Sequence, residues 1–304
     1  TGTSNTSLGN EALKCNTTAS NNTAVGRLSL AANTTGTQNT AVGFCSLNAN
    51  TTGANNVAIG VQALDTNTTA NENVAVGRCS LFSNTEGTKN IAIGSYSLDT
   101  NSTGDSNIAI GYQALDANTT ADNNVAVGDS ALKANTTGTN NVAVGKDALL
   151  ANVSGQQNVA IGVCALNANT GYNNVAIGYQ ALDANIGGDS NVAVGLHSLL
   201  LNTTGNYNVA VGRKALCSNT TGLTNVAIGL TALNDNTEGT NNIAIGCAAL
   251  LDHSTGNNNV AIGVATLFDN TTASDNTALG SYSMVKNTTG TANLAAGTNA
   301  MACN

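Results

Sequence analysis

The chain has 304 residues with 33 glycines, no proline, no tryptophan, 9% charged and 3% aromatic residues, a composition unlike that of an ordinary globular domain. Its formal charge is −8, and its nine Lys and Arg residues are too few for a basic stripe, so nucleic acid is excluded as a partner. It has no apolar run of about 18 residues, so membrane insertion is not expected.

A repeat of 17 residues occupies the whole sequence. Eighteen glycines mark it, from Gly9 to Gly297, and the only step of 16 runs from Gly162 to Gly178. The unit reads N-[VIT]-A-[VIL]-G-x-x-[AS]-L-x-x-N-T-T-G-x-x, and positions are numbered here from its first glycine. Position −4 is Asn in all eighteen units, position −2 is Ala in seventeen, position +4 is Leu in sixteen, and position +7 is Asn in seventeen. The repeat predicts one continuous array over residues 1–304 without caps.

Each unit predicts two short strands and two turns. Val57-Ala58-Ile59 alternates large, small and large residues, which is typical of a strand with its large side chains on one face. Ala63-Leu64 continues the pattern as a second strand, after a sharp turn at Gly60. Asn-Thr-Thr-Gly makes the return turn. We expect the Val, Ile and Leu columns to lie inside.

The predicted fold is all-β, a parallel β-solenoid (β-roll) of eighteen 17-residue coils. A rise of about 4.8 Å per coil gives a rod of roughly 85 Å. A helix is the poorer interpretation, because each unit holds Gly and clustered Asn and Thr. The Ala column indicates a close approach, either inside a very flat coil or against a neighbouring chain, and the sequence leaves both open.

The Asn columns have two competing interpretations. Buried amides can form ladders that satisfy backbone groups from coil to coil. Alternatively, position +7 begins an N-x-[ST] sequon in twelve units, and these sequons would place glycans along one edge. Because a buried Asn cannot carry a glycan, the two interpretations exclude each other, and we favour the ladder, with an exposed face for the Thr residues. The candidate glycosylation sites are Asn16, Asn33, Asn50, Asn67, Asn101, Asn118, Asn135, Asn152, Asn202, Asn219, Asn270 and Asn287. Asn5 and Asn21 begin two further sequons elsewhere in the unit.

Asn39-Thr40-Ala41-Val42-Gly43 and Asn56-Val57-Ala58-Ile59-Gly60 carry a resemblance that covers the whole chain. N-V-A-I-G-x-x-A-L resembles the head repeats of trimeric autotransporter adhesins. The longer unit, N-T-A-V-G-x-x-A-L-x-x-N-T-T-G, is similar to repeats of phage tail fibres and algal-virus surface glycoproteins. The resemblance implies a left-handed parallel β-roll in a trimer that displays a binding surface.

Titratable groups are sparse, so no enzyme, catalytic residue, cofactor or metal site is expected. His197 and His253 have no evident nucleophile or metal partner, and His253 replaces the Asn of position +7. Asp99 and Asp116 occupy the same position in adjacent coils, where the two carboxylates could hold a cation or a sugar hydroxyl, but a solvated face without a function is the simpler interpretation. The Gly-rich nonapeptide that binds Ca²⁺ in secreted β-rolls is absent.

The ends and the cysteines predict association with itself. Joining Asn304 to Thr1 continues the repeat in register, which predicts a head-to-tail polymer. Cys15 and Cys303 share position +6, so stacked end coils would bring them within disulfide range as inter-subunit residues. The other five cysteines, which we expect to be small apolar residues or free thiols, are Cys45, Cys79, Cys164, Cys217 and Cys247.

These observations predict a structural or adhesive fibre outside the cell or on a cell or virion surface. Its expected partner is itself, as a head-to-tail polymer or a homotrimer, and surface glycans are a second candidate. The alternative is a glycan- or ice-binding β-solenoid. A binding site would show as a local break in the pattern, for which the coils around Tyr172, Ile186-Gly187 and Tyr207 are the candidates.

Overall fold

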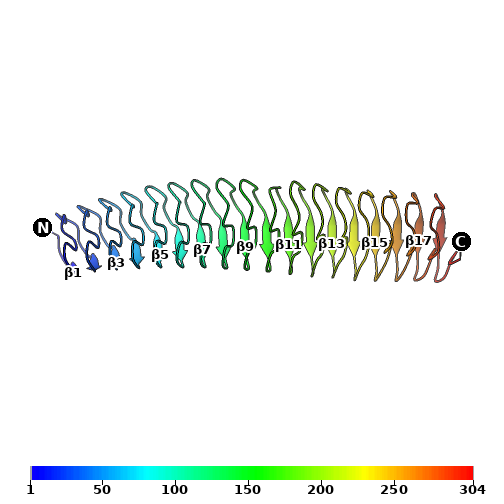
Figure 1. Ribbon diagram of the computed structural model, residues 1–304, viewed down its shortest axis with the longest axis horizontal. Coiled ribbons are helices and arrows are strands. Elements are labelled where there is room, and N and C mark those ends of the chain that lie inside the picture. The colour runs from blue at the N-terminus through cyan, green and yellow to red at the C-terminus, as the bar shows by residue number, and fades with distance from the viewer. Residues whose placement is uncertain (1, 304) are drawn as a thin grey trace. The chain divides into compact units, whose positions relative to one another are not determined.

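The computed structural model describes residues 2–303, in which every coil contributes one three-residue strand and no helix is found. Contacts divide the chain into two compact units, residues 1–156 and residues 157–304. Each unit is a stack of nine coils, and in Figure 1 each strand lies beside the strand of the next coil. The predicted all-β, parallel β-solenoid of eighteen coils is therefore confirmed.

The strands pair in parallel and in register, so that one repeat position faces the same position of the next coil, as Val57 faces Val74. The strands of the first unit are β1 (Thr6–Leu8), β2 (Thr23–Val25), β3 (Thr40–Val42), β4 (Val57–Ile59), β5 (Val74–Val76), β6 (Ile91–Ile93), β7 (Ile108–Ile110), β8 (Val125–Val127) and β9 (Val142–Val144). Those of the second unit are β10 (Val159–Ile161), β11 (Val175–Ile177), β12 (Val192–Val194), β13 (Val209–Val211), β14 (Val226–Ile228), β15 (Ile243–Ile245), β16 (Val260–Ile262), β17 (Thr277–Leu279) and β18 (Leu294–Ala296).

The core of each coil is built from small residues and one Leu. Ala58 of β4 and Leu64 at position +4 are completely buried. The strand neighbours of Ala58 point the other way: Val57 is half-buried, and Ile59 is 40% exposed. The expectation that the Leu column lies inside is confirmed, and the expectation that the Val and Ile columns lie inside is wrong. The coil interior, already filled by Leu and Asn side chains, has room only for a methyl group at the middle of the strand.

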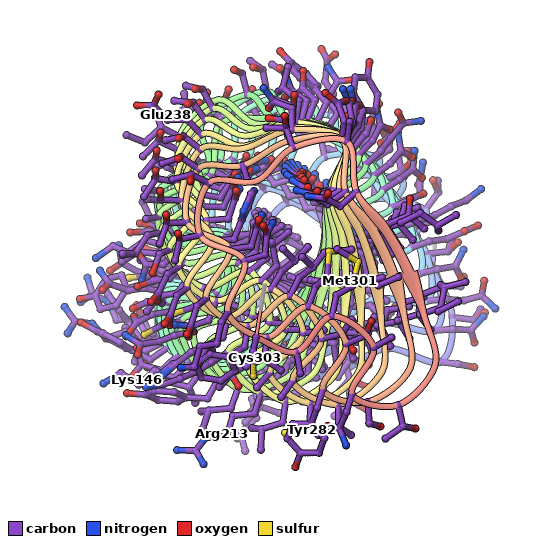
Figure 2. The ribbon with its side chains drawn as sticks, turned by 90° about the vertical axis from the view of Figure 1, so that its right-hand side faces the viewer. Lys146, Arg213, Glu238, Tyr282, Met301 and Cys303 are labelled. Carbon is purple, nitrogen blue, oxygen red and sulfur yellow. The ribbon has the colours of Figure 1, made fainter. Side chains whose placement is uncertain are left out.

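The residues of the Ala column are therefore small because they lie inside the coil, which is the first of the two alternatives left open by the sequence. Ala109, Ala126 and Ala143 in the first unit are all completely buried. Figure 2 shows the labelled side chains of Lys146, Glu238 and Tyr282 pointing outward from the coils.

The glycine after each strand is required by the neighbouring coil. Gly60 has a φ of 140°, and a Cβ built on it would lie 2.4 Å from the carbonyl oxygen of Gly77 in the next coil. A side chain there would meet backbone, which cannot move without breaking the stacking. Close approach of the next coil thus explains this glycine in the coils before the last, whereas a Cβ on Gly297 of the last coil would meet no atom within 4 Å.

Ala63-Leu64 is not a second strand, contrary to the sequence prediction. Residues 61–66 form turns in which Gln62 and Leu64 have left-handed φ values of 57° and 53°. The backbone still pairs between coils, because Leu64 N donates to Ser80 O at 3.0 Å and Gln62 N donates to Phe44 O at 2.8 Å. Left-handed residues other than Gly cost about 1–3 kcal/mol each, and here burial of Leu64 and this pairing offset that cost.

Candidate functional surfaces

Two ladders of buried asparagines run along the inside of each unit. Asn56 at position −4 donates from Nδ2 to Ala70 O at 2.9 Å, and its Oδ1 accepts from Asn73 N at 3.0 Å. Asn67 at position +7 donates from Nδ2 to Ala70 O at 3.1 Å and to Asn50 Oδ1 at 2.8 Å. Figure 2 shows such stacked nitrogen and oxygen atoms inside the ribbon. The predicted ladders are confirmed, and they satisfy backbone groups that would otherwise be buried without partners.

The ladder also decides between the two interpretations of the sequons. Of the twelve candidate glycosylation sites at position +7, Asn16 is half-buried and the other eleven are buried. Asn118 is representative: its Nδ2, the atom to which a glycan would be attached, donates to Ala121 O at 3.1 Å and to Asn101 Oδ1 at 2.8 Å. The folded coil therefore has no place for a glycan at these eleven buried positions.

The outer face of the strands is apolar, a feature that our sequence interpretation missed. Positions −3 and −1 hold Val, Ile, Leu, Thr or Ala in every coil and never a charged residue. Ile59, Ile110 and Ile228 are 40%, 37% and 39% exposed. We call the surface formed by positions −3 and −1 of all the repeats in one nine-coil unit the strand face of that unit. The signal in the sequence was the strict Ala between two large residues, because only the face with the small residue fits inside a narrow coil.

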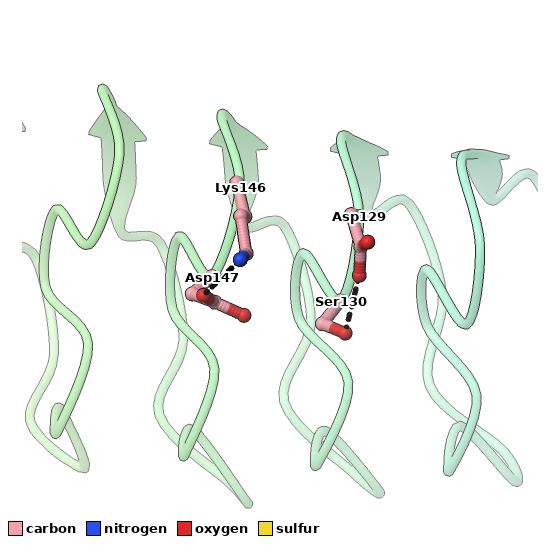
Figure 3. Close-up of polar contacts among 4 residues, drawn as sticks. All are labelled: Asp129, Ser130, Lys146 and Asp147. Carbon is pink, nitrogen blue, oxygen red and sulfur yellow. Dashed lines mark hydrogen bonds and ion pairs between the residues drawn. The ribbon is translucent and has the colours of Figure 1, made fainter.

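Position +1 borders the strand face and carries charges in some coils. Lys146 lies next to Asp147 in the same coil, with 3.9 Å between Nζ and Oδ2. In the preceding coil Ser130 Oγ donates to Asp129 Oδ1 at 2.8 Å (Figure 3). These pairs are partly solvated and contribute little to stability. In the coils that carry them, the charged residues at position +1 form the border of the uncharged face.

The two Thr residues of the return turn have different environments. Thr51 at position +8 donates from Oγ1 to Thr68 O at 3.0 Å, which adds a third ladder between coils. Thr52 at position +9 is exposed. Position +9 is also exposed where it is Glu86 or Glu238. The accessible Thr hydroxyls therefore form a single interrupted file in each unit.

Asp99 and Asp116 are neighbours, as the repeat predicted, and they interact. Burial, and secondarily the charge of Asp116, raise the pKa of Asp99 from 3.8 to about 6. Asp99 Oδ1 is buried without a hydrogen-bond partner. Burial also raises the pKa of Asp116, and the charge of Lys133 in the next coil opposes this increase. Asp99 therefore takes up a proton near pH 6, well above the pH at which an ordinary carboxyl group does.

The coils of Asp99 and Asp116 also carry aromatic rings. Tyr96 and Tyr112 meet edge to face with 6.3 Å between ring centroids, and the Arg78 guanidinium lies 5.3 Å from the Tyr96 centroid. Gln113 Nε2 donates to Asp116 Oδ2 at 3.4 Å. Rings and polar groups together are a combination that can contact the faces and hydroxyls of a sugar.

Both histidines have structural surroundings. His197 Nε2 lies 3.1 Å from Gln180 Oε1 on the surface. His253 is completely buried, with Nε2 2.8 Å from Gly256 O and Nδ1 2.9 Å from Asn270 O. Because His253 replaces a ladder Asn, the buried Oδ1 of Asn236 in the preceding coil has no partner. His253 is thus an imperfect rung of the ladder.

All seven cysteines are free. Cys15 and Cys303, the predicted inter-subunit residues, are both exposed, whereas Cys45 and Cys217 are buried. Asn304 and Thr1, which would form the predicted junction between chains, lie outside the described residues.

The coils around the 16-residue unit carry exposed apolar and aromatic residues. Tyr172 and Tyr207 are 42% and 63% exposed, and Ile186 and Gly187 are also exposed. Tyr172 N donates to Asp189 Oδ1 at 2.7 Å, and Tyr207 N donates to Asp189 O at 3.1 Å. These bonds hold the loop backbone and leave the rings on the surface.

Within residues 2–303 no pocket is found, and no three His, Cys, Asp or Glu residues group to hold a metal ion. The same residues include no helix that is long and apolar enough to span a bilayer. No protein-family model matches the sequence, and no curated protein matches it as a relative.

Proposed function

We propose that the chain is a structural or adhesive surface fibre that works outside the cell, with copies of itself as its main partner and a repeated face for display. The observation that carries this proposal is the strand face. A face in contact with water alone would accept Lys or Glu, yet all positions −3 and −1 are uncharged, and 31 of these 36 positions are Val, Ile or Leu. An exposed, flat, apolar sheet face of this kind favours packing against another chain.

The size of the strand face suits such packing. Nine strands at about 4.8 Å and three residues at about 3.3 Å each give roughly 430 Å² per unit. The strand face of one unit is therefore an exposed apolar patch of several hundred Å², a size that often has a function in binding. Association of copies, either as a homotrimer or side by side in a filament, would cover this surface.

Molar mass measured by light scattering and sedimentation tests lateral association. We expect the chain to be oligomeric and Ile110→Lys with Val144→Lys to shift it toward the monomer, because both substitutions charge the strand face. The matched control is Thr120→Lys, on the exposed return turn, which should leave the mass unchanged. A wild-type chain that stays monomeric at tens of micromolar would contradict this part of the proposal.

The head-to-tail form of the filament is tested separately by its cysteines. Under oxidising conditions we expect multiples of the chain mass on non-reducing gels, and Cys15→Ser or Cys303→Ser should abolish them. Both thiols are exposed, so neither substitution should disturb the fold. Short rods of one length that do not respond to reductant would exclude this polymer.

A second candidate is glycan binding, and the cluster around Tyr96 and Tyr112 favours it. Tyr112 is 50% exposed, and Gln113 and Asp116, which are hydrogen-bonded to each other, belong to the same coil. A glycan array probed with the wild-type chain and with Tyr112→Ala tests this function. Binding that is lost in Tyr112→Ala supports it, and identical signals from the two proteins contradict it. The alternative of ice binding rests on one interrupted file of Thr residues and is the weaker of the two.

A further inference from the structure

The chain contains fourteen N-x-[ST] sequons, and their asparagines fall into distinct structural positions. Twelve lie at position +7, Asn5 lies at position −4, and Asn21 lies at position −5. Transfer of an N-glycan needs the side-chain Nδ2 of the asparagine to be free and accessible to an enzyme. The state of each Nδ2 therefore decides which sequons the folded chain can use.

Thirteen of the fourteen asparagines use their amides inside the coils. At position +7 the amide bonds illustrated by Asn118 recur from coil to coil. The two sequon asparagines of the first coil are also engaged: Asn5 Nδ2 donates to Ala19 O at 2.9 Å, and Asn16 Nδ2 donates to the same oxygen at 3.2 Å. Attaching a sugar at any of these nitrogens requires that a ladder be broken.

Asn21 differs from these thirteen asparagines in the position and the bonding of its side chain. Its side chain is exposed, and no hydrogen bond of its Nδ2 is found among the described residues. Its backbone is held in a left-handed turn with a φ of 61° by a bond from Asn21 N to Thr3 O at 3.0 Å. The residues at the same position in the coils on either side, Ser4 and Gln38, are also exposed, so a glycan has free space around it.

We propose that Asn21 is the N-glycosylation site of the folded chain and that the ladder sequons are closed. The donor is an oligosaccharide linked through pyrophosphate to a lipid. A bond forms between Asn21 Nδ2 and C1 of the first sugar, and the bond from C1 to the pyrophosphate oxygen breaks. The lipid pyrophosphate leaves, and the amide proton passes to the base of the transferase. This inference does not depend on the proposed fibre function.

The repeat supplies the reason why Asn21 stands alone. Exposed asparagines occur at position −5 in other coils, such as Asn55 with a φ of 59°, but the residue two positions later is then Val or Ile. Asn21 is followed by Thr23, because β2 is one of the few strands that begin with Thr. A change from Val to Thr at the start of another strand should therefore open a second site.

The test uses chain folded without glycosylation, which is then treated with purified oligosaccharyltransferase and a lipid-linked oligosaccharide. Peptide mass mapping should find one glycan, at Asn21. Thr23→Val should abolish it while keeping a residue found at the start of most strands. Thr35→Ala, which destroys the Asn33 sequon and leaves the Asn33 ladder bonds in place, should change nothing.

Two further measurements make the result decisive. Tryptic peptides of the same chain should be glycosylated at ladder sequons as well, which shows that folding and not sequence closes them. Val57→Thr should gain a second glycan at Asn55, whose backbone N donates to Thr37 O at 3.0 Å as Asn21 N does to Thr3 O. A glycan on a buried ladder asparagine of the folded chain, an unmodified Asn21, or no gain in Val57→Thr would each overturn the inference.

Discussion

Asn56 and Asn67 donate to the same acceptor, the carbonyl oxygen of Ala70, at 2.9 and 3.1 Å. One asparagine precedes the strand and the other begins the return turn, so the two amides hold the closing turn from both sides. Each amide also bonds to a neighbouring coil. The same asparagines therefore stabilise both the closing turn of one coil and the stacking of that coil on its neighbours.

Removing a ladder amide should be costly. Asn67→Ala leaves Asn50 Oδ1 buried without its donor and takes an acceptor from Asn84 Nδ2. We expect a loss of about 2–4 kcal/mol in the free energy of unfolding, since each unsatisfied buried group costs about 1–3 kcal/mol. Urea denaturation measures this loss. The control Thr69→Ala, at an exposed position of the same turn, should stay within about 0.5 kcal/mol of the wild type.

The strand glycine should tolerate no side chain. Gly111 has a φ of 139°, and its Cβ would lie 2.3 Å from Gly128 O, so Gly111→Ala combines backbone strain with a backbone collision. We expect a loss of about 3 kcal/mol or more in stability, measured by thermal and chemical unfolding. Gly187→Ala is the control, because a Cβ built on Gly187 meets no atom within 4 Å and its φ is not left-handed. An equal loss in both variants would refute this explanation of the glycine column.

Substitutions on the two sides of one coil should separate core from surface. Leu115→Asp buries a charge at a completely buried position, and we expect a loss of several kcal/mol and less cooperative unfolding. Ile110→Asp changes the strand face of the same coil and should mainly alter association. Circular dichroism melts, together with molar mass, distinguish the two effects. Unchanged melting of Leu115→Asp would contradict the core assignment.

His253 should make the second unit sensitive to acid. Burial lowers the pKa of His253 below its ordinary 6.5, although the carbonyl oxygens of Gly256 and Asn270 favour its charged form. The unfolded chain then binds the proton more tightly, so stability is present above about pH 6.5 and is lost as pH falls through the lower folded pKa. His253→Asn should raise stability and reduce this loss, since an amide can donate to Asn236 Oδ1. Unfolding midpoints between pH 8 and pH 5 measure the difference.

Asp99 should make the stability of the first unit depend on pH in the opposite sense to His253. Because its pKa is raised from 3.8 to about 6 in the folded chain, its contribution to stability is present below pH 3.8 and is lost as pH rises through about 6. The gain in the free energy of unfolding of Asp99→Asn over the wild type should therefore be larger at pH 7.5 than at pH 5. Glu86→Gln, at an exposed position, is the control. An identical pH dependence in wild type and Asp99→Asn would contradict the shared environment of Asp99 and Asp116.

The sequence by itself determined the coil, its period and its polar ladders. A spacing of 17 residues with a single step of 16, in short units that hold Gly and clustered Asn and Thr, indicates parallel, in-register stacking of coils. An Asn repeated in every unit indicates a buried amide, because turn preference alone would allow substitution. Only the tertiary structure decided which side of Val57-Ala58-Ile59 faces inward. A strand of three residues alternates equally well in either direction, and the narrow interior, filled by Leu64 and the Asn ladders, selects the Ala. The left-handed turn at Leu64 was equally hidden, because its cost is offset by burial and by bonds to other coils that no local pattern records.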